Sequence, residues 1–541
     1  MGAGVGAARR RRGTAAGLFG TALLVAGTVL TSGGAYAQPA PTPGGHSTAR
    51  AGGDQGDRDD QGRDDQGGQG EHDGRKGDQD RDKDKGRPRP GASPTRRAEP
   101  PAPGGGDPTA ARPAPAAAAV LATAQTGPEA ALPTTQGLQQ ALAAALADRN
   151  LGTVTLAVAD AAGGQLLYGS GENTAATPAS TTKLATCVAA LSLVPGDTRL
   201  TTRVVKGTTP GSITLVGGGD PTLTALPADQ VQIGGQPTDP DTAPASLDAL
   251  ARQTAAALKA AGTTTVTLDY DVSLYSGNPL HKFHDDDTNI APVVPLMVDE
   301  GRVDPKSREE APKRVADPAA SAAEAFTGLL RAQGVTVEGR AKPAAAPAAA
   351  DAPLLGRVDS PTIARLVERL LTTSDNQLAE AVARRAALAA HQPASFEGAA
   401  AAVTQELSKL GVPMAGVTLN DGSGLHTGNG IPPAVLVRLL ALAASDQHPA
   451  LRPVLTGLPV AGFTGTLAKR YGSASGAADA AGLIRAKTGS LSGVNTLAGT
   501  VVDADGRLLV FAVMTRSPAL ADSTRAAMDR IAARLATCGC H

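Results

Sequence analysis

The sequence predicts an α/β fold of the α+β type, with an antiparallel sheet flanked by helices, an adjoining helical region and an inserted β-rich region. Hairpin patterns stand near both ends of the foldable chain. Residues 153–171 alternate around the turn AAGG, and residues 494–516 alternate around DADG. Between them, residues 201–358 change to short strands and turns. The two hairpins are therefore expected to share one sheet, which the middle of the chain interrupts.

Apolar residues at helical spacing predict several helices. The pattern covers residues 138–150 and 519–536, a stretch from about Ser180 to Leu193, and a longer helical region over 360–390. The chain has 541 residues, whereas single cores stop growing at about 250 to 300 residues. Several domains are therefore expected.

Composition divides the chain into four regions. In the first 37 residues, basic residues precede an apolar stretch of about 17 residues and the small-residue site AYA, which predicts a signal peptide cleaved after Ala37. A short membrane anchor is the alternative. The next region is rich in Pro, Gly and charge and is expected to be disordered, as a spacer or as a binder of a charged polymer. The predicted regions are a signal peptide (1–37), a disordered linker (38–130), one discontinuous folded domain (131–200 and 359–541) and one or more inserted domains (201–358).

The charge balance and the hydropathy limit the function classes. The formal net charge is −1, so the whole chain has no field that would attract nucleic acid or an anionic membrane. After the first apolar stretch, no segment is apolar enough to span a bilayer. We expect a secreted, extracytoplasmic protein without a transmembrane anchor once the signal peptide is removed.

Three cysteines allow two interpretations. Export would place Cys187, Cys538 and Cys540 in an oxidising compartment. A bridge between Cys538 and Cys540 would close a very tight loop, so a long-range bridge from Cys187 to one of them is expected. The alternative is that Cys187 is a small buried residue without a bridge.

The sequence STTK places Ser180 and Lys183 three residues apart, on the same face of the predicted helix. Such a pair supplies a nucleophile and a nearby amine, and the start of the helix supplies a backbone N–H near the positive end of the dipole. Taken alone, the pattern also fits a capping serine followed by a surface lysine.

Two further patterns support a catalytic interpretation of this pair. SDN, at Ser374, Asp375 and Asn376, lies between two helical segments, and KTGS begins at Lys487 just before a predicted strand. A second S-x-N pattern, at 276–278, lies in a Gly/Pro turn and is interpreted as structural. The order S-x-x-K, SDN, KTG is the signature of penicillin-binding proteins and class A β-lactamases.

The long spacing between the first two motifs resembles one branch of that superfamily. The branch is the type 4, or class C low-molecular-mass, penicillin-binding proteins, which are D-alanyl-D-alanine carboxypeptidases and endopeptidases with domains inserted at this point. The resemblance covers about residues 135–536 and extends to LVGGGDPTL, APVVPLMVDEGRV, NDGSGLHTGNGIPP and LPVAGFTGTLAKR. It implies a transpeptidase-like catalytic domain, peptidoglycan stem peptides as substrates and β-lactam antibiotics as covalent inhibitors.

The resemblance also implies a role for each motif residue. Ser180 would attack the carbonyl of a D-Ala-D-Ala bond, and Lys183 would accept its proton. Burial and the second cation Lys487 would lower the pKa of Lys183. Ser374 would pass a proton to the leaving amine, and Asn376 would hold Lys183 or the substrate backbone.

The KTGS segment would bind substrate. Thr488 and Lys487 suit the free terminal carboxylate, and the backbone N–H groups of Ser180 and Ser490 would form an oxyanion hole. Gly489 would let substrate lie against the strand edge without a Cβ in the way. Asp269 and Asp271 are weaker candidates for binding the amine of a peptidoglycan side chain.

No cofactor and no metal site are expected. The segment HKFHDDD, residues 281–287, contains metal-ligand residue types but is interpreted as a solvated loop. Two rival functions stay open. A class A-like β-lactamase would need an E-x-x-L-N stretch, which ELSKL at Glu406 does not match. A catalytically silent cell-wall binding protein would not need intact motifs. The sequence leaves open whether carboxypeptidase or endopeptidase action dominates.

Overall fold

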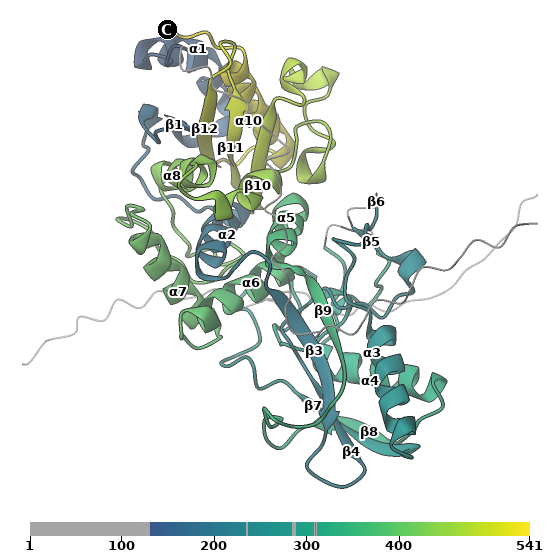
Figure 1. Ribbon diagram of the computed structural model, residues 1–541. Coiled ribbons are helices and arrows are strands. Elements are labelled where there is room, and N and C mark those ends of the chain that lie inside the picture. The colour runs from purple at the N-terminus through teal and green to yellow at the C-terminus, as the bar shows by residue number, and fades with distance from the viewer. Residues whose placement is uncertain (1–129, 234–235, 284–287, 308, 310) are drawn as a thin grey trace, which may run out of the picture. The chain divides into compact units, whose positions relative to one another are not determined.

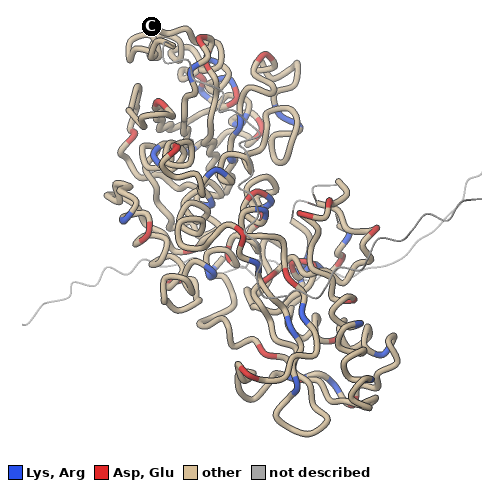
Figure 2. The backbone as a smooth tube through the Cα atoms, in the orientation of Figure 1, with Lys and Arg blue, Asp and Glu red and all other residues tan. Residues whose placement is uncertain are grey.

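The computed structural model describes residues 130–541, except for 234–235, 284–287, 308 and 310. The predicted signal peptide (1–37) and all but the last residue of the predicted linker (38–130) lie outside the described residues. Within the described part, no helix is both long and apolar enough to cross a bilayer. Acidic and basic residues are interspersed along it (Figure 2).

The first and last thirds of this part meet in one five-stranded antiparallel sheet (Figure 1). Its strand order is β10-β11-β12-β1-β2. Both predicted hairpins are present, and they join side by side because β1 pairs with β12 from Thr153–Arg516 to Asp160–Leu509. The strands are β1 (Thr153–Asp160), β2 (Leu166–Ser170), β10 (Ile484–Leu491), β11 (Val494–Val502) and β12 (Leu508–Arg516).

Helices cover both faces of this sheet because its inner strands alternate apolar residues to either side. On one face, Leu156 and Val158 pack with α1 (Thr135–Leu146) and α10 (Ala521–Ala536). On the other face, Ala157 and Ala159 belong to the core that contains α8 (Pro433–Ala444) and α2 (Thr182–Leu193). The small alanines there give the helices space close to the sheet.

Helix α2 (Thr182–Leu193) is the centre of the helical region. Ten of its twelve residues are buried, so it lacks a solvent-facing side. Around it lie four helices, α5 (Ile363–Thr373), α6 (Asn376–Ala389), α7 (Phe396–Lys409) and α8 (Pro433–Ala444), with the short α9 (Pro453–Thr456) beside α5 and α8. This burial places the side chains at the start of α2 in a dry interior.

A second five-stranded sheet, with its own core, lies between α2 and α5 in sequence. Its order is β8-β7-β4-β3-β9, and β4, β7 and β8 run parallel to one another. The parallel pairs need crossovers, which α3 and α4 supply. The strands are β3 (Arg199–Lys206), β4 (Ser212–Val216), β7 (Thr265–Asp271), β8 (Thr336–Pro343) and β9 (Leu354–Thr362). The helices are α3 (Leu247–Ala260) and α4 (Pro318–Ala332). The two-residue strands β5 (Gln232–Ile233) and β6 (Gln236–Pro237) form a separate hairpin. The predicted α+β fold with an inserted β-rich region is confirmed.

The expected long-range disulfide is wrong. Cys538 and Cys540, just after α10, are bonded to each other, and Cys187 is a free thiol buried in α2. Cys187 therefore matches the alternative, a small buried residue in the helical core.

Candidate active site

Ser180 and Lys183 lie at the entrance to α2. A 3₁₀ turn, Ala179–Thr181, precedes the helix, and Ala179 adopts a left-handed φ of 48°. Such a backbone is strained for a residue with a Cβ and is typical of functional sites. Ser180 is half-buried, Lys183 is fully buried, and no side chain caps α2 at Thr181. The alternative of a capping serine followed by a surface lysine is therefore excluded.

The Lys183 amine contacts three oxygen atoms. Its Nζ atom lies 2.9 Å from Ser180 Oγ, 2.7 Å from Asn376 Oδ1 and 2.6 Å from the carbonyl oxygen of Ser423. Burial lowers the pKa of Lys183 to about 8, although the charges of Asp421, Asp375 and Glu380 oppose this shift. The neutral amine keeps two N–H groups for Asn376 and Ser423 and one lone pair for the Ser180 hydroxyl.

Lys487 forms a second buried amine beside the first. Its Nζ atom donates to Ser374 Oγ at 2.8 Å and to the carbonyl oxygen of Thr488 at 2.7 Å. Burial, followed by the charge of Lys183, lowers the pKa of Lys487 well below its usual value. The expected lowering of the Lys183 pKa by Lys487 is not among the causes of its shift, which is due to burial; the charge of Lys183 instead lowers the pKa of Lys487.

The SDN motif is a tight turn between α5 and α6. Ser374 ends α5 with a left-handed φ of 60°, and the Asp375 carboxylate caps α6 by accepting from Leu378 N at 2.9 Å. Asn376 is the first residue of α6, and its Nδ2 atom donates to the carbonyl oxygen of Asn289 at 3.2 Å. The turn therefore places Ser374 toward Lys487 and Asn376 toward Lys183.

A cluster of charged residues supports this turn, with Glu300 and Arg302 coming from the inserted region and Arg369 from α5. Glu300 is buried, has a φ of 58°, and pairs with Arg369 and with Arg302, the latter at 2.6 Å. Burial would raise the pKa of Glu300, but Arg369 and Arg302 hold it at about 2. Asp375 has the opposite shift: burial, then the charge of Glu300, raises its pKa to about 6. Glu300 lies in APVVPLMVDEGRV, but no pattern in the sequence predicted this role for it.

The KTGS segment lies on β10, an edge strand of the five-stranded antiparallel sheet. Thr488 Oγ1 donates to Thr466 Oγ1 at 2.8 Å, and Ser490 is exposed, with its Oγ donating to Asn495 Oδ1 at 3.2 Å. Thr466 comes from the quoted stretch LPVAGFTGTLAKR and was also missed.

Gly489 is needed for a different reason from the one expected. A Cβ at this position would lie 2.2 Å from Thr496 Oγ1, 2.8 Å from the carbonyl oxygen of Pro178 and 3.0 Å from Ser180 N. Glycine thus allows β10 to approach the Ser180 segment of the protein. Its lack of a side chain makes room for this chain, so the structure gives no support to the expected role in leaving room for substrate.

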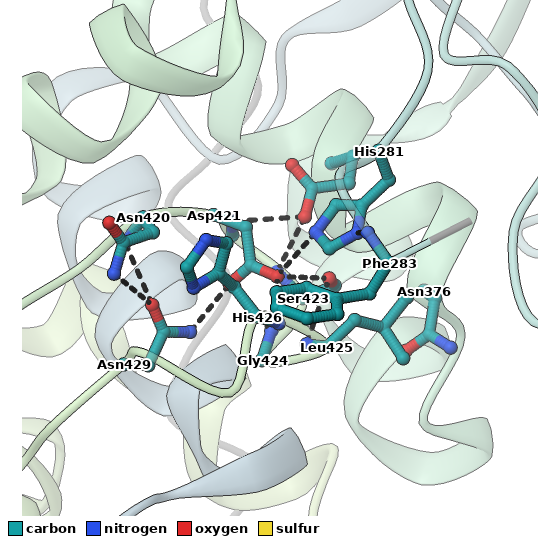
Figure 3. A network of polar contacts seen from close by, with 12 residues as sticks. His281, Phe283, Asn376, Asn420, Asp421, Ser423, Gly424, Leu425, His426 and Asn429 are labelled. Atoms are coloured by element: carbon teal, nitrogen blue, oxygen red, sulfur yellow. Dashed lines mark hydrogen bonds and ion pairs between the residues drawn. The ribbon is translucent and has the colours of Figure 1, made fainter. Parts of the chain in front are cut away.

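The interpretation of residues 281–287 as a solvated loop is wrong at His281. Residues 284–287 lie outside the described part, but His281 is 4% exposed, and its Nε2 atom lies 2.9 Å from Asp421 Oδ2 (Figure 3). The same carboxylate oxygen accepts from Ser423 Oγ at 3.0 Å. Asp421 and Ser423 both lie in NDGSGLHTGNGIPP, and no pattern in the sequence predicted a role for either of them.

His281, Asp421 and Glu380 could geometrically surround a metal ion, because one ligand atom from each lies within 4.8 Å of the others. Their hydrogen bonds favour a different arrangement. His281 Nδ1 accepts from Phe283 N at 3.1 Å, so the ring proton is on Nε2, which faces Asp421. Glu380 Oε1 accepts from the backbone N–H groups of residues 422 and 423. The donor atoms are therefore already used in a polar network.

Of the two weaker candidates in the inserted region, Asp271 serves the local backbone. Its Oδ1 atom accepts from Ser273 N at 2.8 Å, and its Oδ2 atom accepts from Ala348 N at 2.7 Å. Asp269 lies on β7, in register with Thr214 and Lys342. The bonds of Asp271 favour a loop-bracing role.

The chain is similar to known carboxypeptidases over most of its length. It is 37% identical over 415 residues to the carboxypeptidase DacB of Mycolicibacterium smegmatis, covering 75% of this chain and 85% of that protein. It is 36% identical over 423 residues to a carboxypeptidase of Mycobacterium tuberculosis, covering 76% and 86%. Penicillin-binding protein 4 of Haemophilus influenzae shares the fold, with a TM-score of 0.58 at 20% identity over 75% of this chain and 98% of that one.

A family model describes the same relationship across nearly all of the folded chain. The model of the D-Ala-D-Ala carboxypeptidase 3 (S13) family matches residues 138–313 and 307–535. The match extends through the inserted region as well as the three motifs, which decides against a class A β-lactamase. The chain belongs to the D-Ala-D-Ala carboxypeptidase 3 (S13) family of serine-type peptidases.

Proposed function

We propose that this enzyme cleaves D-Ala-D-Ala stem peptides of peptidoglycan outside the cytoplasm, through an acyl-enzyme formed on Ser180. The observation that carries the proposal is the contact between Ser180 Oγ and a buried amine whose pKa is lowered to about 8. A nucleophilic hydroxyl next to an amine that can be neutral near physiological pH is the arrangement that acyl transfer by serine requires.

Acylation follows from the contacts of Lys183. The neutral amine accepts the Ser180 proton as Oγ forms a bond to the carbonyl carbon and the π electrons move to the carbonyl oxygen. Asn376 Oδ1 and the Ser423 carbonyl accept from the amine and keep its lone pair toward Ser180. The C–N bond then breaks, the electron pair returns to the carbonyl, and the departing nitrogen takes up the proton. Water later hydrolyses the ester and releases Ser180.

Ser374 and Lys487 provide a route for that proton. Ser374 Oγ accepts from Lys487 Nζ, which leaves the hydroxyl hydrogen of Ser374 free to be donated to the leaving nitrogen. Ser374 would regain a proton from Lys183, which holds the Ser180 proton, so that both side chains return to their starting protonation states. The terminal carboxylate that the second D-Ala carries would favour the protonated form of the nearby Lys487 amine. The resulting positive charge and the hydroxyl of Thr488 suit this carboxylate. Arg525 adds a cation near the exposed end of β10, because its guanidinium donates to Ser490 Oγ at 3.1 Å.

The same chemistry would let a β-lactam acylate Ser180. The strained amide of the lactam presents a carbonyl to Oγ, and its leaving nitrogen stays attached to the acyl group, so it remains in the site and hinders water. A solved structure of the Haemophilus influenzae protein is a complex with a β-lactam, which supports this part of the proposal. Ser180 and Ser490 N–H groups are proposed as the oxyanion donors.

Labelling with a fluorescent penicillin tests the proposal. The unsubstituted protein should become labelled when folded but not after denaturation. Folded Ser180→Ala should stay unlabelled. Release of D-Ala from peptides with and without a free terminal carboxylate then separates carboxypeptidase from endopeptidase action. Absence of label on folded native protein, or labelling that persists in Ser180→Ala, would contradict the proposed nucleophile.

A further inference from the structure

The inserted region contributes a buried histidine to a polar chain that ends at the proposed general base. Four groups are joined in sequence: His281 Nε2, the Asp421 carboxylate, Ser423 and the Lys183 amine. Figure 3 shows the first three of them. We propose that His281 is a positioning residue for the acylation step, acting through Asp421 and Ser423 on the direction of the Lys183 amine. The inference rests on the proposed function, because it assigns Lys183 as the proton acceptor.

The Ser423 carbonyl sets the orientation of the Lys183 lone pair. A neutral amine has two N–H groups, and its lone pair can face Ser180 only when both N–H groups have other acceptors. The Ser423 carbonyl is one of these two acceptors, at 2.6 Å. A shift of this carbonyl would therefore turn the amine away from Ser180 without changing either residue of the pair.

Side chains on both sides fix the backbone at Ser423. Its N–H donates to Glu380 Oε1 at 2.8 Å, and its hydroxyl donates to Asp421 Oδ2 at 3.0 Å. The next residue, Gly424, has a φ of 87°, and a Cβ there would lie 1.9 Å from the carbonyl oxygen of Ala179. This segment is thus pressed against the Ser180 turn, where small displacements matter.

Asp421 collects the donors that hold this segment. One carboxylate oxygen accepts from Gly424 N at 3.0 Å and from Asn429 Nδ2 at 2.6 Å. The other accepts from Ser423 Oγ, from His426 N at 2.8 Å and from His281 Nε2 at 2.9 Å. Its side chain is fully buried, so each donor offsets the cost of keeping a carboxylate away from water.

Among these donors, only His281 comes from the region inserted between α2 and α5. The proton must be on Nε2, because Nδ1 already accepts from Phe283 N. The ring is also held by an edge contact with Phe396, with the ring centroids 5.2 Å apart. A rigid donor from the inserted region therefore completes the hydrogen bonding around Asp421 and fixes Ser423 in place.

Acylation kinetics of four variants test the proposal. His281→Gln keeps a donor at about the position of Nε2, His281→Asn ends short of Asp421, and His281→Ala removes the donor. Leu280→Ala, on an exposed neighbour, is the matched control. The rate constant for acylation by a penicillin should fall between about 10- and 100-fold in the Ala and Asn variants, the range expected for a misplaced reacting group. The dissociation constant of the preceding complex should stay unchanged.

Rescue and coupling distinguish positioning from simple destabilisation. His281→Gln should recover most of the rate, and the His281→Ala/Ser423→Ala double variant should lose less than the product of the two single losses. Thermal unfolding of every variant shows which ones fold. If His281→Ala does not fold, the comparison of Gln with Asn decides. Equal acylation rates in the native, Asn and Ala proteins, or Gln and Asn variants that are equally slow, would overturn the proposal.

These outcomes are separate from failure of the proposed function. If Ser180→Ala still becomes labelled, the nucleophile is wrong and the positioning role has no target. If Ser180→Ala is inactive while His281→Ala and His281→Asn acylate at the native rate, the proposed function stands and the role of His281 alone is refuted.

Discussion

The amine of Lys183 lies 2.9 Å from the hydroxyl of Ser180 and is fully buried at the start of α2. This contact combines two effects that a surface pair would not provide. The fixed geometry aims the amine at one hydroxyl, and the dry surroundings lower the free-energy cost of its neutral form relative to the charged form.

The rate of acylation by a penicillin should therefore rise with pH through about 8, the pKa of Lys183. Below this pKa the amine carries three protons and has no lone pair for Ser180, and above it the neutral form accumulates. Stopped-flow measurement of acylation on either side of pH 8 checks this. Lys183→Arg, which keeps the charge but stays protonated, should be inactive throughout. A rate independent of pH across this range would contradict the assignment.

Gly489→Ala should slow acylation and lower the thermal stability. The added Cβ would lie 2.2 Å from Thr496 Oγ1 and 2.8 Å from a backbone carbonyl, so β10 must move away from the Ser180 turn. Gly472→Ala is the matched control, because a Cβ there meets nothing within 4 Å. A Gly489→Ala variant with native stability and native rate would show that the strand has room to adjust.

The motifs made much of this site predictable, because residues three apart on a helix must be neighbours wherever the helix lies. Direct hydrogen bonds join Ser180 and Asn376 to Lys183, and a separate one joins Ser374 to Lys487. The roles of Glu300 and His281 depend on long-range packing, which leaves no periodic pattern in the nearby sequence. From composition alone, a histidine in a loop next to acidic residues is expected to be exposed. The contact between His281 and Asp421 arises only when the chain folds.

The disulfide pairing is a second feature that local sequence patterns did not predict. The tightness of the loop argued against a bridge between residues 538 and 540, whereas the fold keeps Cys187 inside α2. The parallel strands β4, β7 and β8 were also beyond the sequence patterns, which indicated short strands but not their partners.

The free thiol gives a direct check of this pairing. A thiol reagent should not modify the native, unreduced protein, because Cys187 is fully buried and burial raises the pKa of its thiol. After denaturation without reductant, the protein should react at one cysteine, and mass spectrometry should locate the label on Cys187. A label on Cys538 or Cys540 would contradict the pairing.

Two substitutions at Ser374 separate its backbone from its hydroxyl. Ser374→Ala and Ser374→Gly both remove the acceptor of Lys487 and should slow acylation to a similar extent. They should differ in stability, because the left-handed φ of 60° costs alanine about 1 kcal/mol that glycine avoids. Chemical denaturation should therefore show the Gly variant to be at least as stable as the Ala variant. The opposite order would indicate that the turn relaxes when the side chain is lost.

The pKa shifts of Asp375 and Glu300 are opposite in direction, so each should make the free energy of unfolding depend on pH in a different way. The pKa of Asp375 is raised from 3.8 to about 6, so the folded state binds more protons and this contribution falls as pH rises across that interval. The pKa of Glu300 is lowered from 4.5 to about 2, so its contribution rises with pH across that lower interval. Denaturation at a series of pH values should show both slopes.

Asp375→Asn should remove the falling slope while keeping an oxygen to cap α6, so its stability relative to the native protein should increase from about pH 4 to 6. Asp375→Ala is the control: it also loses the cap and should be less stable by about 1 kcal/mol. Because the Asp375 charge raises the pKa of Lys183, the Asn variant should also reach its full acylation rate at a lower pH than the native protein. Parallel stability curves for the native and Asn proteins would show that Asp375 keeps an ordinary pKa, and the support from Glu300 would then be steric.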